Sequence, residues 1–389
     1  MPFSHDRRPR ILFLIPSLAG GGAEKVASLL IPDLAAEFDL TLALLEDWRS
    51  FDLLGHIRTI AFSRRLHRPL AHLLSIPRHF FSLVRLIRRE RMPLVLSSME
   101  QANILNILAS FITGHAAVIA QHNSPLQQYR RKGLLGRLIL GASKCLYPKA
   151  ARIIAVSEGI KDVLVRDYRI APSQITVIPN PIDLRALQQQ AGVEPSLGLP
   201  PKFILHVGRL SLANKAQDVL LAAFRVLRRE FPDLDLIFVG DGPDRAKLKR
   251  LVRTSGLDNA VHICGWQSNV AAYMSRAEIL VLCSHNEGWP MALAEAMACG
   301  CPVIAADCPT GPREILGDSE YGILVPMNSP EALADAIRSL LKDRALRSHY
   351  QGQARIRVEN YARSQIGRRY ASLLSGVFNS ITVREGKTP

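Results

Sequence analysis

Two carboxylates eight residues apart stand in a stretch of sequence that could bind a polar ligand. Glu287 and Glu295 belong to residues 284–305, which read SHNEGWPMALAEAMACGCPVIA. The stretch begins at the end of one apolar strand, EILVLCS, and passes through a turn and a helix into a second strand, CPVIAAD. Glu295 lies about one turn inside the helix, where its paired acceptor oxygens can hold vicinal hydroxyl groups. The alternative is an ordinary strand–helix–strand unit with surface glutamates.

The start of the same helix is a candidate anion site. Pro290 suits the first helical turn, where its missing N–H is no loss. Met291, Ala292 and Leu293 would then direct free backbone N–H groups at a ligand above the sheet. The stretch therefore predicts one site that recognises both hydroxyl groups and negative charge.

Two cations are expected at the same kind of sheet edge. Arg209 ends the apolar strand FILHVGRL at its carboxyl side, where open α/β sheets bind ligands. Lys215 follows six residues later, in the loop before a helix predicted at 218–230. A guanidinium fork and an ammonium point charge together suit a diphosphate. Solvated surface cations are the alternative.

The 284–305 stretch as a whole resembles the Glu-x7-Glu motif of retaining nucleotide-sugar glycosyltransferases of the GT-B fold, glycosyltransferase family 4 in particular. The family pattern is roughly E-G-F-G/P-x4-E-A-M-A-x-G-x-P-V-I-A. Trp289 replaces the usual Phe here, and Pro290 takes the alternative to Gly. Arg209 and Lys215 match the family pattern G-R-L…K-G, except that Ala216 stands where Gly is usual.

The resemblance implies a role for each of these residues. Arg209 and Lys215 would bind the diphosphate of the donor, Glu287 a hydroxyl of the donor sugar, and Glu295 the ribose hydroxyls. Both glutamates would therefore orient the donor rather than attack it. The resemblance also implies retention of the anomeric configuration, with the leaving phosphate as a possible acceptor of the proton.

A glycine-rich loop follows the first predicted strand. Gly20, Gly21 and Gly22 match neither a dinucleotide fingerprint nor a phosphate loop, so alone they indicate a flexible turn. Within the family, a loop of the form G-G-A-E faces the donor phosphates and the acceptor, which makes Gly21 and Gly22 expected donor contacts.

Three further residues are expected at the substrate cleft. His122 follows the strand AAVIAQ, and a histidine at the carboxyl end of a strand can reach a ligand or brace its loop. Related enzymes have a histidine near this place, close to the donor sugar, so His122 is a candidate catalytic residue with Arg209, Lys215 and Glu287. The segment DCPTGPRE resembles the family's G-G-x-x-E turn, which would put Gly311 and Glu314 at the cleft border.

The sequence predicts neither a metal ion nor a cofactor, since the nucleotide sugar is a substrate. Asp233-Leu-Asp235 matches the DxD metal motif of the other glycosyltransferase fold. It lies at the amino end of a predicted strand, away from the expected cleft, where a turn and a strand entrance explain it better. Arg209, Lys215 and the helix start would supply the positive charge instead.

The alternation of apolar strands and helical patterns predicts an α/β protein of two domains, since 389 residues are long for one. Strands are expected near 10–17, 40–46, 94–99, 116–122 and 152–157, then at 203–210, 234–242, 261–266, 278–284, 301–307 and 322–326. Each series predicts a Rossmann-like, doubly wound parallel sheet. The GT-B resemblance makes 1–190 the acceptor and membrane-facing domain, 191–361 the nucleotide-sugar domain, and 362–389 a helix and tail that return to the first domain across a cleft.

The net charge of +15 lies mainly in the first half. Residues 1–190 carry 25 Lys and Arg against 14 Asp and Glu, or +11, while residues 191–389 carry 24 against 20, or +4. Residues 64–91 and 126–152 mix apolar and basic side chains at helical spacing, as interfacial helices do. This pattern predicts docking on an anionic membrane surface. The alternative is a soluble enzyme whose arginines are simply solvated and whose apolar faces pack in the core. Nothing resembles a nucleic-acid-binding module.

Cysteine usage and hydropathy indicate the cellular compartment of the protein. Six cysteines without paired spacing suggest a reducing compartment, and no signal peptide is expected because HDRRPR leads directly into a strand. Residues 102–120 are apolar but interrupted by polar residues, so they predict a helix followed by a strand rather than a membrane span. We therefore expect a cytoplasmic protein, peripheral on the inner face of the cytoplasmic membrane.

The function expected from the resemblance is transfer of a hexose or N-acetylhexosamine from a nucleotide sugar to a lipid-linked or surface-glycan acceptor. E-G-W-P with T-G-P-R-E is most similar to bacterial enzymes that use UDP-sugars. Two other classes stay open at this point. A sugar-nucleotide epimerase of the same architecture would turn over without an acceptor, and a non-catalytic, membrane-bound sugar-nucleotide module would not turn over at all.

Overall fold

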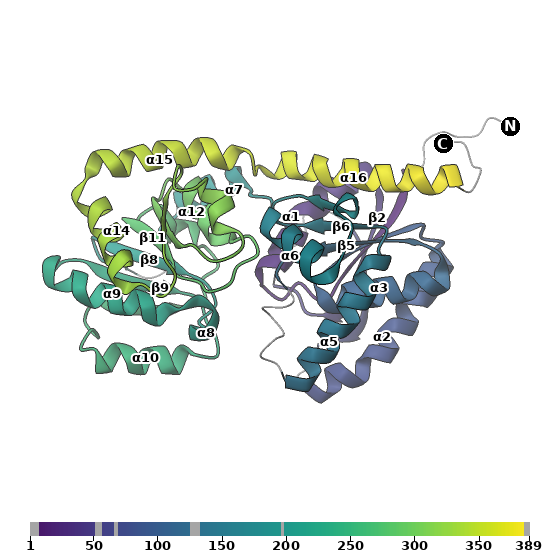
Figure 1. The fold of residues 1–389 in the computed structure, drawn as a ribbon, viewed down its shortest axis with the longest axis horizontal. Helices are drawn as coiled ribbons and strands as arrows, with labels where there is room; N and C mark the ends of the chain where they lie inside the picture. The colour runs from purple at the N-terminus through teal and green to yellow at the C-terminus, as the bar shows by residue number, and fades with distance from the viewer. Residues whose placement is uncertain (1–7, 51–56, 66–68, 125–132, 196–197, 385–389) are drawn as a thin grey trace. The chain divides into compact units, whose positions relative to one another are not determined.

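The computed structural model describes residues 8–50, 57–65, 69–124, 133–195 and 198–384 (Figure 1). The chain forms two compact units, Met1–Pro181 with Arg363–Pro389 and Ile182–Ala362. The C-terminal tail 385–389, residues 126–132 of the second basic stretch and residues 66–68 of the first lie outside the described residues.

The first unit is built on a parallel sheet of seven strands in the order β3-β2-β1-β4-β5-β6-β7. All of its strand pairs are parallel. The strands are β1 (Arg10–Ile15), β2 (Asp39–Asp47), β3 (Arg58–Arg64), β4 (Leu94–Ser98), β5 (Ala116–Gln121), β6 (Arg152–Ala155) and β7 (Ile175–Val177). The central strands are buried on both faces, which explains their continuous apolar runs. Strands β3 and β7, at the two edges, were not predicted.

Helices flank this sheet, as βαβ crossovers require. They are α1 (Gly22–Glu37), α2 (Pro69–Glu90), α3 (Glu100–Thr113), α5 (Gly133–Leu146), α6 (Glu158–Tyr168) and α16 (Arg363–Arg384). The C-terminal helix α16 packs along α1, as Figure 1 shows, where Gly367 meets the side chain of Asp33. The prediction that this helix returns to the first domain is confirmed.

The second unit has a parallel sheet of six strands in the order β10-β9-β8-β11-β12-β13. The strands are β8 (Phe203–Val207), β9 (Asp235–Val239), β10 (Val261–Gly265), β11 (Ile279–Leu282), β12 (Val303–Ala306) and β13 (Ile323–Val325). The helices that the site uses are α8 (Leu212–Lys215), α9 (Gln217–Glu230), α12 (Met291–Ala298) and α13 (Pro312–Leu316). The others are α7 (Leu184–Ala191), α10 (Arg245–Thr254), α11 (Ala271–Met274), α14 (Pro330–Lys342) and α15 (Arg344–Glu359). The predicted fold of two Rossmann-like parallel sheets is therefore confirmed.

Residues 102–120 form most of α3 and β5, as predicted, and their polar residues are buried together. Asn103 accepts from the Ser97 hydroxyl at 2.8 Å, and Asn106 contacts Ser97 and the His115 ring at 2.9 and 2.8 Å. Burial lowers the pKa of His115 to about 4, so its ring is neutral at pH 7. Of the helices in the described ranges, none has the length and apolar composition that crossing a membrane requires.

Candidate functional site

The candidate site lies at the carboxyl edge of the second unit's sheet. Chain order reverses between β8 and β11, and such a switch point is where open α/β sheets bind ligands. The loop after β8 carries Arg209, and the loop after β11 carries Glu287. The loop after β12, next along the sheet, carries Gly311.

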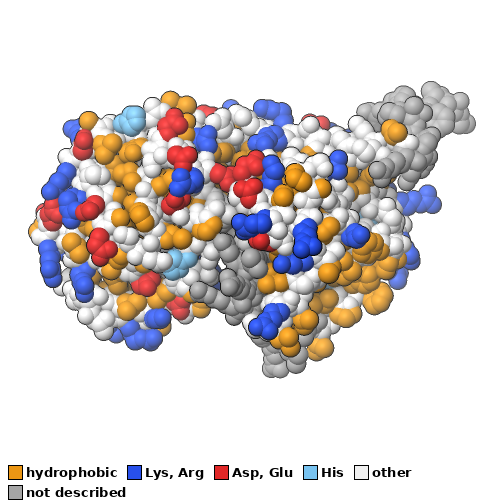
Figure 2. Space-filling model, in the orientation of Figure 1, with side chains coloured by type: hydrophobic (Ala, Val, Ile, Leu, Met, Phe, Trp, Pro, Cys, Tyr) orange, Lys and Arg blue, Asp and Glu red, His pale blue; other side chains and the backbone are white. Residues whose placement is uncertain are grey.

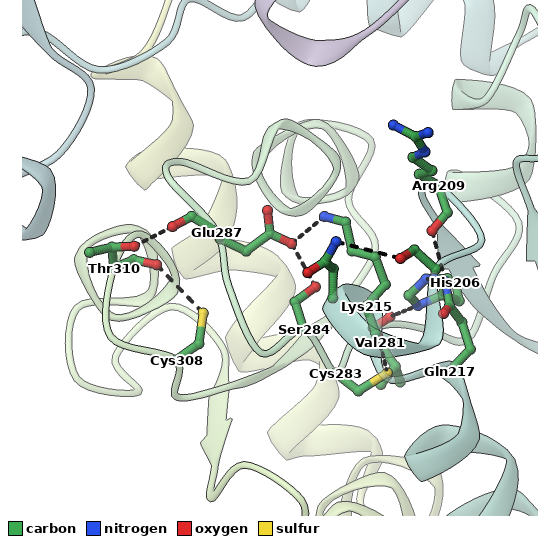
Figure 3. Close-up of polar contacts among 12 residues, drawn as sticks. His206, Arg209, Lys215, Gln217, Val281, Cys283, Ser284, Glu287, Cys308 and Thr310 are labelled. Atoms are coloured by element: carbon green, nitrogen blue, oxygen red, sulfur yellow. Dashed lines mark hydrogen bonds and ion pairs between the residues drawn. The ribbon is translucent and has the colours of Figure 1, made fainter. Parts of the chain in front are cut away.

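An ion pair forms the centre of this site. The Lys215 Nζ donates to Glu287 Oε1 at 2.5 Å, although 72 residues separate the two in sequence. The Ser284 hydroxyl donates to the same oxygen at 2.6 Å. The Lys215 side chain is 22% exposed and that of Glu287 is 9% exposed, so the pair is largely withdrawn from water. The cation and the carboxylate that were assigned to adjoining parts of the donor therefore lie in direct contact (Figure 3).

Lys215 is the last residue of the short helix α8, and Cys283, directly after β11, holds the end of this helix in place. The Cys283 thiol donates to the carbonyls of Lys215 and Ala216 at 3.1 and 3.0 Å. Burial raises the pKa of this thiol to about 12, so it keeps its proton for that contact. Ala216 takes the left-handed conformation, φ 48°, in which glycine is favoured. The departure from the family's Gly therefore costs strain at a fully buried turn.

Arg209 is held through its backbone and leaves its guanidinium exposed. The His206 Nδ1 donates to the Val281 carbonyl at 3.0 Å, which leaves Nε2 as an acceptor for Gln217, 3.3 Å away. Gln217 in turn donates to the Arg209 carbonyl at 2.9 Å. Burial lowers the pKa of His206 to about 4, which keeps the ring neutral for this relay. Figure 3 shows the Arg209 guanidinium extending away from the Lys215–Glu287 pair.

The start of α12 differs in detail from the prediction. Pro290 is the N-cap residue, with extended backbone, rather than part of the first turn. Because the Leu293 N–H donates to the Pro290 carbonyl at 3.1 Å, the prediction of a free amide at Leu293 is wrong. The amides that can meet an anion are those of Met291 and Ala292. Glu295, on the same helix, is 4% exposed.

Gly311 allows the loop after β12 to pack against the Glu287 loop. Its φ is 93°, and a Cβ there would lie 2.9 Å from the Gly288 carbonyl oxygen, so only glycine fits without a shift. The neighbouring Thr310 hydroxyl donates to the Glu287 carbonyl. Gly311 therefore supports the loop that carries Glu287. Glu314, on α13, has its carbonyl held by the Arg357 guanidinium.

The glycine loop of the first unit leads from β1 into α1. Gly20 has φ 98°, and Gly21 is the N-cap of the helix. The Glu24 carboxylate folds back over Gly21, where an added Cβ would clash with its oxygen. Burial raises the pKa of Glu24. Gly21 and Gly22 are exposed, so their backbone is open to a ligand.

His122 lies directly after β5 in the first unit. The residue is 9% exposed, and no partner for Nδ1 is found in the described part of the chain. Burial lowers its pKa to about 4. His122 is therefore a buried, neutral ring whose Nδ1 has no partner in the described part of the chain.

The match of Asp233-Leu-Asp235 to a DxD metal motif has a structural explanation. Asp235 begins β9 and contacts Arg228 and the His262 ring at 3.3 and 2.8 Å. Within the described ranges, no three His, Cys, Asp or Glu side chains gather as a metal site requires.

Sequence reasoning missed several supporting residues. They are Ser284 and Thr310, which hold Glu287, and His206, Gln217 and Cys283, which hold the loops of Arg209 and Lys215. Only Ser284 had a signal, because it opens the Glu287 stretch. The others act through backbone carbonyls, which no residue spacing reveals.

Two family models match the chain, one in each half of the sequence. The model "Glycosyltransferase Family 4" matches residues 20–186, and the model "Glycosyl transferases group 1" matches residues 193–357.

Among curated relatives, one from Campylobacter jejuni is an N-acetylgalactosamine-N,N'-diacetylbacillosaminyl-diphospho-undecaprenol 4-alpha-N-acetylgalactosaminyltransferase. It is 29% identical over 93% of this chain and 98% of its own length. An Escherichia coli UDP-Gal:alpha-D-GlcNAc-diphosphoundecaprenol alpha-1,3-galactosyltransferase is 25% identical over 80% of this chain and 82% of its own. Among solved structures, Anabaena HepE in complex with UDP and glucose has a TM-score of 0.78 at 23% identity, covering 95% of this chain and 100% of that one.

Proposed function

Since this chain is a glycosyltransferase of the GT-B fold, we propose that it transfers a hexose or N-acetylhexosamine from a UDP-sugar to a lipid-linked or surface-glycan acceptor, with retention of configuration. The observation that carries the proposal is the Lys215–Glu287 pair, at the same edge of the sheet as Arg209 and the start of α12. The relatives' names support the substrate classes, since they describe transfer to diphospho-undecaprenol glycans, in one case from UDP-Gal.

Departure of the diphosphate is the step that the site is suited to assist. Breaking the sugar–phosphate bond adds negative charge to the leaving group, and fixed positive groups stabilise that charge. Lys215 is pre-positioned by its contact with Glu287, and the exposed Arg209 is free to close over a diphosphate. The Met291 and Ala292 amides add partial positive charge at the helix start.

The remaining residues orient substrates in this proposal. Glu287 keeps one carboxylate oxygen on Lys215 and Ser284, and its second oxygen can accept from a sugar hydroxyl. Glu295 is assigned to the ribose. In the first unit, Gly21, Gly22 and His122 are the proposed substrate contacts.

Thermal unfolding with a panel of UDP-, GDP- and ADP-sugars tests the donor class. A donor at a hundred times its dissociation constant should stabilise the protein by roughly 2.7 kcal/mol. UDP-sugars should do so, and Lys215→Ala should abolish the shift. Stabilisation by GDP- or ADP-sugars alone would overturn the UDP assignment. Product formation only with a polyprenyl-diphosphate glycan present would establish transfer, whereas conversion of the donor alone would favour an epimerase.

We further propose that the first unit docks on an anionic membrane surface through α2, α3 and α5. These helices expose large apolar side chains, between 47% and 74% accessible: Leu74, Phe81, Phe111, Ile112, Leu134, Leu135 and Leu138. Exposed cations stand among them: Arg78, Arg85, Arg88, Arg89, Arg137 and Lys144. Figure 2 shows this mixture of apolar and basic side chains on the face formed by α2, α3 and α5.

Acidic side chains do not offset this charge in the described parts of the three helices. Glu90 is occupied by the Arg58 guanidinium at 3.1 Å, and Glu100 is 6% exposed. An apolar surface of this kind marks an interaction site, and its cations select an anionic partner. The surface therefore fits the headgroup region of an anionic leaflet, the inner face of the cytoplasmic membrane in this proposal.

Co-sedimentation with vesicles tests the docking. Binding should rise with phosphatidylglycerol content and fall with salt, because each cation contributes about 1 kcal/mol near an anionic leaflet. Arg85, Arg88 and Arg89 replaced together by Glu should therefore weaken binding on the order of 100-fold. A matched control reverses three exposed arginines of the second unit: Arg225, Arg229 and Arg250. Equal loss in the control, or equal binding to neutral vesicles, would overturn the docking surface and leave the transferase proposal intact.

A further inference from the structure

A strained turn in the first unit stands at the end of β4. Met99 has φ 75° and ψ 150°, a backbone conformation that non-glycine residues rarely adopt. Strand β4 lies between β1 and β5, and chain order reverses between β1 and β4, so the turn occupies the switch point of this sheet. Strain of this kind persists only where surrounding contacts enforce it.

The residue after this turn, Glu100, lies in a buried polar network. Glu100 is 6% exposed, and its Oε1 accepts from the Gln121 Nε2 at 2.9 Å. The same Nε2 donates to the Asn123 carbonyl at 2.6 Å, and the Tyr147 hydroxyl donates to Gln121 Oε1 at 3.3 Å. Gln121 is the last residue of β5 and is 1% exposed.

His122 lies between the two residues that this network holds. Gln121 precedes it and Asn123 follows it. The hydrogen bond from the Gln121 side-chain amide to the Asn123 carbonyl therefore spans the backbone of His122. With Glu100 in place, both Nε2 protons of Gln121 have acceptors. Without it, one buried N–H loses its acceptor and the amide can rotate away from Asn123.

We propose that Glu100 is a positioning residue for His122: through Gln121 it fixes the 121–123 turn and so the orientation of the His122 ring. The inference rests on the proposed function, in which His122 contacts a substrate. Glu100 itself touches no reacting atom in this proposal. A purely structural Glu100, placed to stabilise the start of α3, is the competing explanation.

A double-mutant cycle separates the two explanations in the full chain. Glu100→Ala should lower kcat 10- to 100-fold, because a small displacement of a substrate-orienting group costs that much. Glu100→Gln keeps an acceptor oxygen in place and should recover most of the loss. In a His122→Ala background, Glu100→Ala should lower kcat no further. The same factor in both backgrounds would overturn the proposal.

Nuclear magnetic resonance of ¹⁵N-histidine-labelled protein supplies a readout that needs no activity. The His122 ring shifts should move in Glu100→Ala and stay near wild type in Glu100→Gln. Unchanged shifts in Glu100→Ala would overturn the positioning role, whatever the protein transfers. If Glu100→Ala does not fold, Gln121→Ala breaks the same bridge from the other side and must give the same shifts. Absence of any transfer by a wild-type protein with the expected shifts would count against the proposed function alone.

Discussion

Replacing Lys215 by alanine should separate the chemical role of the central ion pair from its structural role. Its Nζ lies 2.5 Å from Glu287 Oε1, and the two side chains are 22% and 9% exposed. After the substitution the Glu287 carboxylate keeps the Ser284 hydroxyl but loses its counter-charge. A second substitution, Glu287→Gln, then removes the uncompensated charge.

The expected changes in unfolding free energy follow from the burial of the two side chains. Removing one partner of a buried pair costs about 3–5 kcal/mol, and the partial exposure of Lys215 reduces our expectation to about 2–3 kcal/mol. The double variant leaves no unpaired charge. Its loss of unfolding free energy should therefore be smaller than the sum of the two single losses by about 1–3 kcal/mol. Turnover should behave differently. Loss of a charge that stabilises the leaving diphosphate costs on the order of 10²-fold, and neutralising Glu287 does not return that charge.

The assay is urea unfolding and kcat for the wild type, both single variants and the double variant. A matched control is Lys342→Ala in the same unit, because Lys342 Nζ also lies 2.5 Å from a glutamate oxygen, that of Glu230, but with side chains 59% and 34% exposed. An exposed pair contributes about 0–1 kcal/mol, and this control should leave turnover unchanged. Wild-type turnover in the double variant would show that the pair is only structural and would refute the reasoning.

Arg209→Ala should lower kcat on the order of 10²-fold with little change in stability, because its guanidinium is exposed; near-normal kcat would contradict the diphosphate assignment. Activity should survive excess EDTA, and a loss restored by Mn²⁺ or Mg²⁺ would contradict this prediction. Gly311→Ala should destabilise the second unit by about 1–3 kcal/mol in urea unfolding and reduce kcat, because φ is 93° and the added Cβ meets backbone; wild-type behaviour would contradict the packing. Burial lowers the pKa of His115, His122 and His206 to about 4, so their stabilisation should be complete above about pH 6.5 and be lost as the pH falls toward 4. The unfolding free energy should fall by up to about 1.4 kcal/mol per pH unit for each histidine, and equal stability at pH 7 and pH 5 would contradict it.

The sheets could be predicted because their central strands are short apolar runs followed by helical patterns. The two strands that were missed show the limit of that signal. Strand β3, RTIAFSR, has only Phe62 buried, and β7 has three residues. Both are edge strands, so one side needs no apolar cover and the run of apolar residues never forms.

The candidate site could be predicted only as residues sharing one sheet edge. Strand ends place Arg209 and Glu287 near the same switch point, and the family resemblance adds Lys215. Their direct contacts could not be predicted, because Lys215 reaches Glu287 across 72 residues through a helix of four residues held by the Cys283 thiol. A cysteine that donates to backbone carbonyls has no sequence signature.

Helix α2, part of the proposed docking surface, illustrates why helical spacing alone could not separate core residues from residues of a partner surface. Residues 64–91 were predicted to be interfacial, yet Leu83, Val84, Leu86 and Ile87 of α2 pack in the core with residues of α3. Leu74 and Phe81, on the same helix, are 71% and 68% exposed. The exposed face of α2 thus carries apolar side chains among its arginines, in addition to the face that packs against the sheet and α3. Because α2 is already ordered by its core face, docking of the other face requires no folding step. Its free energy should therefore follow the apolar area and the charge that enter the membrane, which the vesicle experiment measures directly.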